Sequence, residues 1–243
     1  MVDDYSFTVD LNKPIVFQVG HLGEAYYEWV HQPIIDKECP RFFANDFFEL
    51  LTRTAWWVVP VVWLPVASWF ISNSSRMGLT DHPDQLVLTV VSGIFVWTLV
   101  EYILHRFLFH MKTRSYWRNT IHYAIHGYHH KYPKDAMRLV MPPPAAAALS
   151  VPVCSITHSL VLSPPSVAPA LFGGAVLGYI AYDLTHYYPH HGKPSKKSTL
   201  KLKRYHLNHH FRIQSKGFGV TSSLWDYVFG TVPSTKAAEK KQN

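Results

Sequence analysis

Four long apolar blocks constrain the fold of this chain more than any other feature of its sequence. A bilayer core about 30 Å thick requires about 20 mostly apolar residues for each spanning helix. Blocks that meet this requirement cover residues 54–72, 85–104, 144–162 and 167–185. Buried helices of a soluble protein are disfavoured, because four such blocks in 243 residues leave no amphipathic helices to surround them. The sequence therefore predicts an all-α integral membrane protein with four transmembrane helices.

The basic residues are distributed unevenly around these blocks. Of 23 Lys and Arg, seven lie in residues 106–138 and eight in residues 193–216, whereas the connection between the first two blocks carries only Arg76. Cytosolic loops carry the excess of Lys and Arg in membrane proteins, so both termini and both basic segments are expected in the cytosol. Basic charge beside spans also predicts membrane lipids, and no nucleic acid, as its partner.

This arrangement predicts one N-terminal segment and one membrane domain. Residues 1–53 are expected to form a cytosolic segment that lies on the membrane interface. Residues 54–243 are expected to form the four-span domain, whose cytosolic regions 105–138 and 186–232 make a helical cap.

Two lysines near the carboxyl end predict a location. Lys240 and Lys241 have the spacing from the terminus that is typical of a dilysine retrieval signal. The predicted topology places this terminus in the cytosol, where such a signal is read. The sequence therefore predicts a multi-pass protein of the endoplasmic reticulum membrane.

Histidines gather next to the predicted spans. The chain has 16 of them, and 12 fall in four clusters on the predicted cytosolic side. The clusters are HRFLFH at 105–110, HYAIHGYHH at 122–130, HYYPHH at 186–191 and HLNHH at 206–210. Within several clusters the histidines are spaced i, i+3 and i+4, which places them on one face of a helix. Imidazole is a ligand for zinc, copper, iron and nickel, so the pattern predicts a metal centre in the cap.

About ten credible ligands exceed the capacity of one ion. A tetrahedral zinc takes four ligands, whereas ten imidazoles suit two ions with five each. Zinc acts as a Lewis acid and supplies no electrons, while two irons can reduce O2 and oxidise an unactivated C–H bond. The alternatives are a zinc-dependent membrane hydrolase and a metal transporter. Transporters bind their cargo near the bilayer midplane, and only His158 lies well inside a predicted span.

The motifs HRFLFH, HGYHH, RLVMPP, THYYPHH, YHLNHH and GFGVTSSLWDYVFGT resemble those of the fatty acid 2-hydroxylases, within the fatty acid hydroxylase superfamily. The resemblance covers essentially the whole chain and is greatest to the plant-type members that act on dihydroceramide. The histidine motifs mark only the superfamily, whereas RLVMPP and the GFG…WD…FGT ending are more specific. The resemblance implies O2-dependent 2-hydroxylation of the N-acyl chain of ceramide or dihydroceramide. A sphingoid-base C4 hydroxylase or a sterol oxidase of the same superfamily is the alternative.

The resemblance also implies the ligands and the electron source. Fungal and animal members carry an N-terminal cytochrome b5 domain that this sequence does not show, so electrons are expected from a separate cytochrome b5 and its reductase. The metals are expected to be iron for activity, with zinc possible in a purified sample. In the family the metal ligands match His105, His110, His126, His129, His130, His186, His190, His206, His209 and His210, while His122 and His191 match positions that do not ligate.

Helical geometry predicts how these histidines divide between two ions. Positions i and i+4 diverge by about 40°, whereas i+3 and i+4 point about 100° apart and should not share an ion. One ion is then expected to bind His105, His110, His126, His130 and His209, and the other His129, His186, His190, His206 and His210.

Three further expectations concern the surroundings of this site. His105 and His110 would lie about 140° apart on a straight helix, so the second span should end or kink between them. Glu101 and Asp183 precede ligands by about one turn and are candidate acceptors for imidazole N–H groups. His31, His82 and His158 lie outside the four clusters and are expected to lie outside the metal centre.

Overall fold

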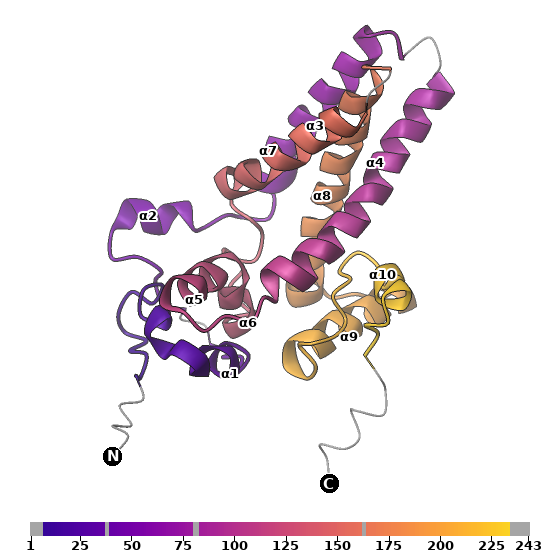
Figure 1. The fold of residues 1–243 in the computed structure, drawn as a ribbon. Helices are drawn as coiled ribbons and strands as arrows, with labels where there is room; N and C mark the ends of the chain where they lie inside the picture. Colours follow the sequence, from indigo (N-terminus) through magenta and orange to yellow (C-terminus); the bar gives the residue numbers. More distant parts are fainter. Residues whose placement is uncertain (1–6, 37–38, 80–82, 162–163, 234–243) are drawn as a thin grey trace.

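The computed structural model describes residues 7–36, 39–79, 83–161 and 164–233, and the regular structure within these ranges is helical. Long helices form a bundle that stands on a cap of short helices (Figure 1). The bundle consists of α3 (Val58–Arg76), α4 (Pro83–Ile103), α7 (Pro143–Leu160) and α8 (Val167–His191). This agrees with the predicted all-α class.

Helix α8 lies at the centre of the bundle, packed against α3 and α4. Of its most apolar stretch 72% is buried, compared with 22% for α3 and 17% for the α4 segment. Helices α4 and α8 approach at glycines: a Cβ on Gly93 would lie 2.1 Å from the Leu171 carbonyl oxygen, and one on Gly174 2.1 Å from that of Val90. Small residues permit such close approach between membrane helices.

The outer surface of the bundle is apolar. Large side chains such as Val61, Trp69, Leu88 and Leu160 are exposed on it. In water such a surface is unfavourable, whereas lipid tails are as apolar as these side chains. The bundle is therefore suited to a hydrocarbon environment.

Three helices are long and apolar enough to cross a membrane by length and composition. They are Val58–Arg76, the continuous helical run Pro83–Phe109, and Val167–His191. The third predicted block is also helical, as α7, but it is not one of these three because two prolines at its start, an internal proline and His158 reduce its apolar character. The fourth span stays a prediction.

Two helix boundaries differ from the prediction. The first span begins at Val58 and not at residue 54, because the Thr54 N–H donates to the Met137 carbonyl oxygen at 2.6 Å and is held by the cap. The last span continues past residue 185 to His191, with Pro189 inside the helix. This extension carries the predicted ligands of α8 out of the bundle and into the cap.

The cap combines the N-terminal segment with both histidine-rich regions. Its own apolar core contains Val19 and Tyr26 of the N-terminal segment together with Phe42, Tyr123 and Tyr128. The predicted division at residue 53 stays a prediction, but residues on both sides of it share this core.

The short helices of the cap are η1 (Val19–Ala25), α1 (Tyr26–Val30), α2 (Asp46–Leu51), α5 (Tyr116–His122), η4 (Tyr123–Gly127), α6 (Tyr128–Lys131), α9 (Lys197–Phe211) and α10 (Leu224–Val228).

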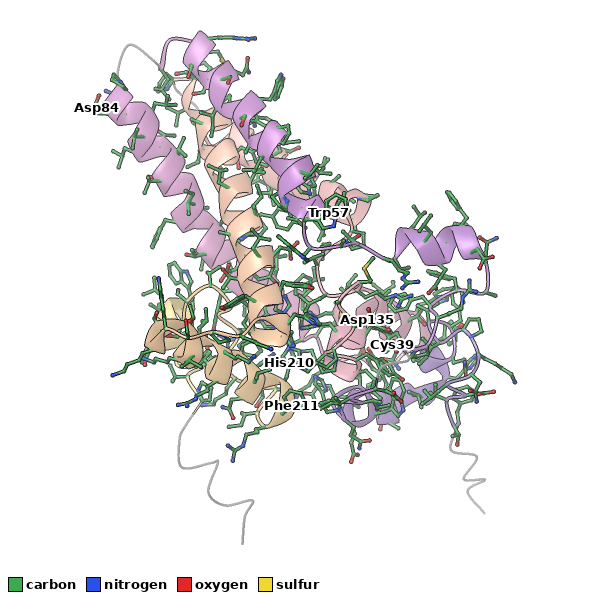
Figure 2. The ribbon with its side chains drawn as sticks, turned by 180° about the vertical axis from the view of Figure 1, so that it is seen from behind. Cys39, Trp57, Asp84, Asp135, His210 and Phe211 are labelled. Carbon is green, nitrogen blue, oxygen red and sulfur yellow. The ribbon has the colours of Figure 1, made fainter. Side chains whose placement is uncertain are left out.

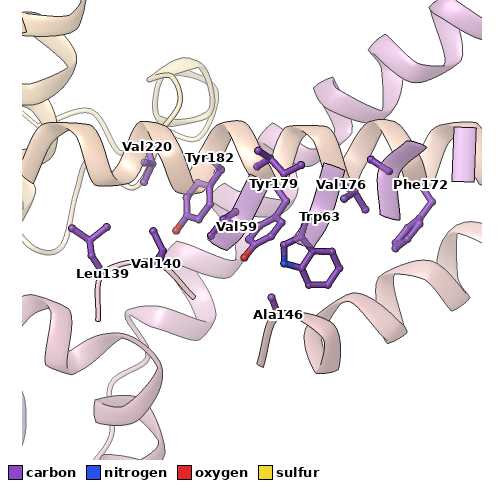
Figure 3. Packing of buried hydrophobic residues seen from close by; sticks show 12 residues of the cluster. Val59, Trp63, Leu139, Val140, Ala146, Phe172, Val176, Tyr179, Tyr182 and Val220 are labelled. Atoms are coloured by element: carbon purple, nitrogen blue, oxygen red, sulfur yellow. The ribbon is translucent and has the colours of Figure 1, made fainter. Parts of the chain in front are cut away.

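A second apolar core joins bundle and cap (Figure 3). Trp63 of α3 packs edge-to-face on Tyr179 of α8, with ring centroids 5.6 Å apart. Leu139 and Val140 from the cap, and Val220 from the C-terminal segment, belong to the same cluster. The foot of α8 is therefore fixed where the histidines gather.

Candidate metal centre

The predicted ligands come from four parts of the chain and meet at the foot of α8. Figure 2 shows His210 at this end of the molecule and Asp84 at the opposite end of the bundle. All ten are buried except His110, which is half-buried. The ring nitrogens of nine of them form two groups, and within each group the candidate ligand atoms all lie within 4.8 Å of one another. One group is His129, His186, His190, His206 and His210, and the other is His105, His110, His126 and His130.

This grouping agrees with the division that helical geometry predicts. The first group has the five expected members, and the second has four of five. The fifth, His209, has its Nε2 atom 2.9 Å from Nε2 of His110, a member of that second group. Adjacent His129 and His130 fall into different groups, as their 100° separation requires. The role of each histidine as a metal ligand stays a prediction.

A change of helix type brings His105 and His110 together. Helix α4 ends at Ile103 and continues as the π-helix η3 (Leu104–Phe109), after which the backbone leaves the helix at His110. A π-helix bonds residue i to residue i+5, so two residues five apart come to neighbouring positions. Their ring centroids are 4.9 Å apart. The wider turn of the π-helix therefore brings His105 and His110 together, whereas the prediction was that the helix ends or kinks between them.

The donor set fits metal ions by its spacing. Two nitrogens, each about 2.1 Å from a shared ion and at right angles, lie about 3 Å apart. The Nε2 atoms of His126 and His130 are 3.1 Å apart, and those of His190 and His206 are 2.8 Å apart. Each pair lies within one group. These distances are those of imidazoles that face a common cation.

The unpaired nitrogen atoms give a second test of the fit. Within the described residues, both ring nitrogens of His129 and His210 and the Nε2 atoms of His105 and His186 are buried without a hydrogen-bond partner. Such atoms cost free energy unless a partner is supplied. An ion in each group supplies a partner to one ring nitrogen of each of these histidines. The residues present therefore fit two transition-metal ions.

Burial also keeps the cap histidines in the form that binds metal. Loss of hydration lowers the pKa of His126, His129 and His130 well below its ordinary value, and neighbouring imidazoles lower the pKa further. The same causes lower the pKa of His206 and His210. A neutral imidazole offers the lone pair that a metal needs.

Backbone carbonyls orient two of the rings. The Nδ1–H of His105 donates to the Phe218 carbonyl oxygen at 2.5 Å, and that of His209 to the Lys216 carbonyl oxygen at 2.8 Å. Both rings then turn Nε2 toward the centre. The motif GFG…WD…FGT contains Phe218, but its place beside the histidines was not predicted.

The two carboxylates that were candidate acceptors have other partners. Glu101 accepts from the backbone N–H of Thr221 at 3.0 Å and from its hydroxyl at 2.5 Å. Asp183 accepts from the backbone N–H of Met141 at 3.4 Å. In the described part of the chain no imidazole donates to either carboxylate. They fix the segments that surround the site.

One of the histidines predicted to lie outside the centre lies against it. The His31 ring is 5.1 Å from that of His130 and 5.8 Å from that of His110, because α1 packs on α6. A single histidine in the N-terminal segment carries no spacing signal that could have revealed this. His158 lies exposed on α7, as expected, and His82 lies outside the described residues.

An apolar cavity of about 620 Å³ extends from the histidines into the bundle. His129 and His186 line it at the cap, and Trp63, Phe172 and Val176 line it within the bundle. Phe172 precedes His186 on α8 by about four turns, or about 21 Å. A long apolar chain can therefore lie in the bundle with one end at the candidate metal centre.

Residues 90–231 match the family model for fatty acid hydroxylases. The chain is 63% identical to a dihydroceramide fatty acyl 2-hydroxylase of Arabidopsis thaliana, over 97% of this chain and 98% of that protein. It is 42% identical to the fatty acid 2-hydroxylase of Rattus norvegicus, over 96% of this chain and 67% of the relative.

A solved structure described as full-length scs7p, with only its hydroxylase domain visible, has the same fold. The TM-score is 0.85 at 40% identity, and the match covers 93% of this chain and 86% of the other. The fold, the two histidine groups and the sequence matches agree with the resemblance found in the motifs. This chain belongs to the fatty acid hydroxylase family.

Proposed function

We propose that this chain is a membrane hydroxylase that adds a hydroxyl group to C2 of the N-acyl chain of dihydroceramide or a related sphingolipid. The observation that carries the proposal is the apolar cavity that begins at His126, His129 and His186 and continues between the bundle helices. The names of the Arabidopsis relatives support this substrate class. A hydrolase of small polar substrates would have no use for such a cavity.

The position of the cavity favours a carbon near the amide. The acyl tail fills the bundle end beside Phe172 and Val176, and the polar head stays at the cap. The first carbons after the carbonyl then lie beside the histidines. A mid-chain carbon would reach them only if the chain bent back on itself. Apolar walls also exclude water from the carbon that reacts.

The ten histidines are proposed to hold two iron ions, five to each ion in the division given above. When bound, these ions supply the redox chemistry that activates O2 for oxidation of a C–H bond. The residues of the chain keep the imidazoles neutral, turn their nitrogens inward and hold the acyl chain in place. A separate cytochrome b5 with its reductase is proposed as the electron source.

The proposed topology follows from charge and from the outer surface of the bundle. All four bundle helices cross the membrane, α7 included, with the cap and both termini in the cytosol. Phe47, Phe48 and Leu50 of α2 are exposed and lie in the headgroup layer. We propose that this membrane is that of the endoplasmic reticulum. This location is inferred from Lys240 and Lys241, which lie outside the described residues.

The test is expression in cells that lack their own sphingolipid 2-hydroxylase, followed by lipid analysis. We expect 2-hydroxy ceramides with the wild-type chain and none with His129→Ala. In a purified assay, turnover should require O2, cytochrome b5 and its reductase. Hydroxylation of the sphingoid base at C4, or oxidation of a sterol, would instead select the alternative within the superfamily. Hydrolytic cleavage of the lipid without O2 and reductant would select the zinc hydrolase.

A further inference from the structure

The C-terminal segment of residues 216–231, named here the clasp, supplies the two carbonyl groups that orient His105 and His209. These histidines come from η3 and α9, and His105 is 113 residues away from its acceptor Phe218. Both belong to the ligand set predicted for one ion, with His110, His126 and His130. The hydrogen bonds of the clasp to histidine rings therefore bear directly on one of the two proposed metal sites.

A single side chain fixes the part of the clasp that carries these carbonyls. Asp226 is fully buried. One of its oxygens accepts from the Phe218 N–H at 2.9 Å and the Thr231 hydroxyl at 2.7 Å, and the other accepts from the Gly219 N–H at 2.7 Å. The Gly217 N–H in turn donates to the Thr231 carbonyl oxygen at 2.9 Å. Successive peptide groups on both sides of the Phe218 carbonyl are held in this way.

The two glycines of GFG are required by this arrangement. Gly217 has φ +77°, a backbone conformation that glycine adopts without strain. A Cβ on Gly219 would lie 2.1 Å from the Ser222 carbonyl oxygen and 2.9 Å from Asp226 Oδ2. The motif GFG…WD is thus the sequence of a tight loop around one carboxylate.

The clasp is also anchored to the helix that carries His105. Trp225 Nε1 donates to the Thr98 hydroxyl at 2.9 Å, and the Tyr102 and Thr231 hydroxyls are 2.8 Å apart. Glu101 binds the clasp at Thr221. Positions 98, 101, 102 and 105 follow the i, i+3, i+4, i+7 spacing of one helix face. The face of α4 that binds the clasp therefore continues into the face of η3 that presents His105.

We propose that Asp226 is a positioning residue for the metal site of His105, His110, His126, His130 and His209. It does not touch the metal. It holds the carbonyl groups that fix the ring orientation of His105 and His209. Other contacts hold the site of His129 and His186. This inference rests on the proposed metal centre.

The decisive measurement is the metal content of the purified full chain during titration with a chelator. Loss of a partner that orients a ligand typically weakens metal binding about 10–100-fold. With Asp226→Asn, we expect one ion to be lost at about 10–100-fold less chelator than in the wild type, while the other ion is retained as before. The intermediate state should hold one ion per chain.

Combination with ligand variants identifies which ion is lost. Asp226→Asn added to His105→Ala should change the metal content no further, because both remove the same ion. Asp226→Asn added to His186→Ala should leave almost no metal at the intermediate chelator concentration. Tyr227→Phe is the matched control: it changes an exposed side chain of the same short helix and should retain both ions.

Thr231→Val is the second variant, because it removes one hydrogen bond to Asp226 and keeps the carboxylate. We expect the same selective loss with a smaller shift, and this variant decides the question if Asp226→Asn does not fold. Retention of both ions, or equal loss of both, would overturn the positioning role. A wild-type chain without metal would overturn the centre and the positioning role together. A wild-type chain with two ions and no 2-hydroxy product would overturn the proposed activity, and the variants would still decide the role of Asp226.

Discussion

In the bundle many large apolar side chains of α3, α4 and α7 are exposed, whereas in the cap the most deeply buried side chains include histidines, Asn119 and Asp226. The outer surface of the bundle suits lipid tails, so its stability depends on close packing between helices. The cap buries polar groups, so its stability depends on the partners of those groups. Stability is therefore expected to depend on helix packing in the bundle and on the partners of buried polar groups in the cap.

The largest expected effect separates a histidine of the cap from one of the bundle. His129→Ala should reduce 2-hydroxylation more than about 100-fold, because it empties a ligand position where both ring nitrogens need a partner. His158→Ala should leave activity within about twofold, because this exposed ring bonds only within its own helix. Lipid product per mole of folded enzyme is the measurement. Equal loss in both variants would refute the distinction.

The second prediction concerns buried charge in the cap. Arg138 pairs with Glu49 and Asp135, and the side chains of these three residues are at most 10% exposed. Arg138→Leu should lower the free energy of unfolding by about 3–5 kcal/mol, because it leaves carboxylates buried without their cation. Arg114 pairs with Glu24 on the surface, where both are more than three-quarters exposed, and Arg114→Leu should cost less than about 1 kcal/mol. Chemical unfolding in detergent compares the two variants.

The third prediction is a pH dependence that arises in the cap. Burial lowers the pKa of His122 to about 4, and Tyr26 Oη lies 2.6 Å from its Nδ1 atom. The unfolded chain binds the same proton near pH 6.5. Between these values protonation favours the unfolded state, so stability is lost as the pH falls from about 6.5 to about 4, on the order of 3 kcal/mol in total.

His122→Gln isolates this contribution. Its unfolding free energy should fall less steeply than that of the wild type below about pH 6.5 and run parallel to it above about pH 7. Curves that stay parallel over the whole range would show that His122 is not buried in its neutral form.

The smallest expected effect tests packing in the bundle with two adjacent glycines. Gly174→Ala should destabilise the bundle by about 1–3 kcal/mol, because its Cβ would meet the backbone of α4 at Val90. Gly173→Ala should cost less, since its first contact is a side-chain atom of Ile71 at 2.7 Å and its first backbone contact, the Ala67 carbonyl oxygen, is 3.1 Å away. Thermal unfolding in detergent measures both. A larger loss with Gly173→Ala would contradict the observed α4–α8 packing.

Local patterns were sufficient where a feature depends on neighbours in the chain. The apolar blocks predicted most ends of the bundle helices to within a few residues, because a spanning helix needs about 20 consecutive, mostly apolar residues. The HxxHH spacing predicted the separation of His129 from His130, because the turn of a helix fixes side-chain directions. The same reasoning predicted that the second span ends or kinks between His105 and His110, but it did not foresee that a π-helix brings the two residues together.

Local patterns failed where partners lie far apart in the chain. His31 is one histidine in a segment without periodic spacing, and it reaches the centre only because α1 packs on α6. The start of α3 at Val58 depends on a hydrogen bond from Thr54 to Met137. For Glu101, proximity to a ligand in sequence suggested an imidazole partner, but its carboxylate turns toward Thr221.

By itself, the sequence determined that the chain is helical, that its long helices are apolar enough for a membrane, and which histidines share a helix face. Each of these follows from composition or from spacing over a few turns. Only the tertiary structure decided that the clasp orients His105 and His209, that Asp226 holds the clasp, and that a cavity connects the histidines with the bundle. The contact between His105 and the clasp joins groups 113 residues apart, and such contacts form only when the packed helices bring distant segments together.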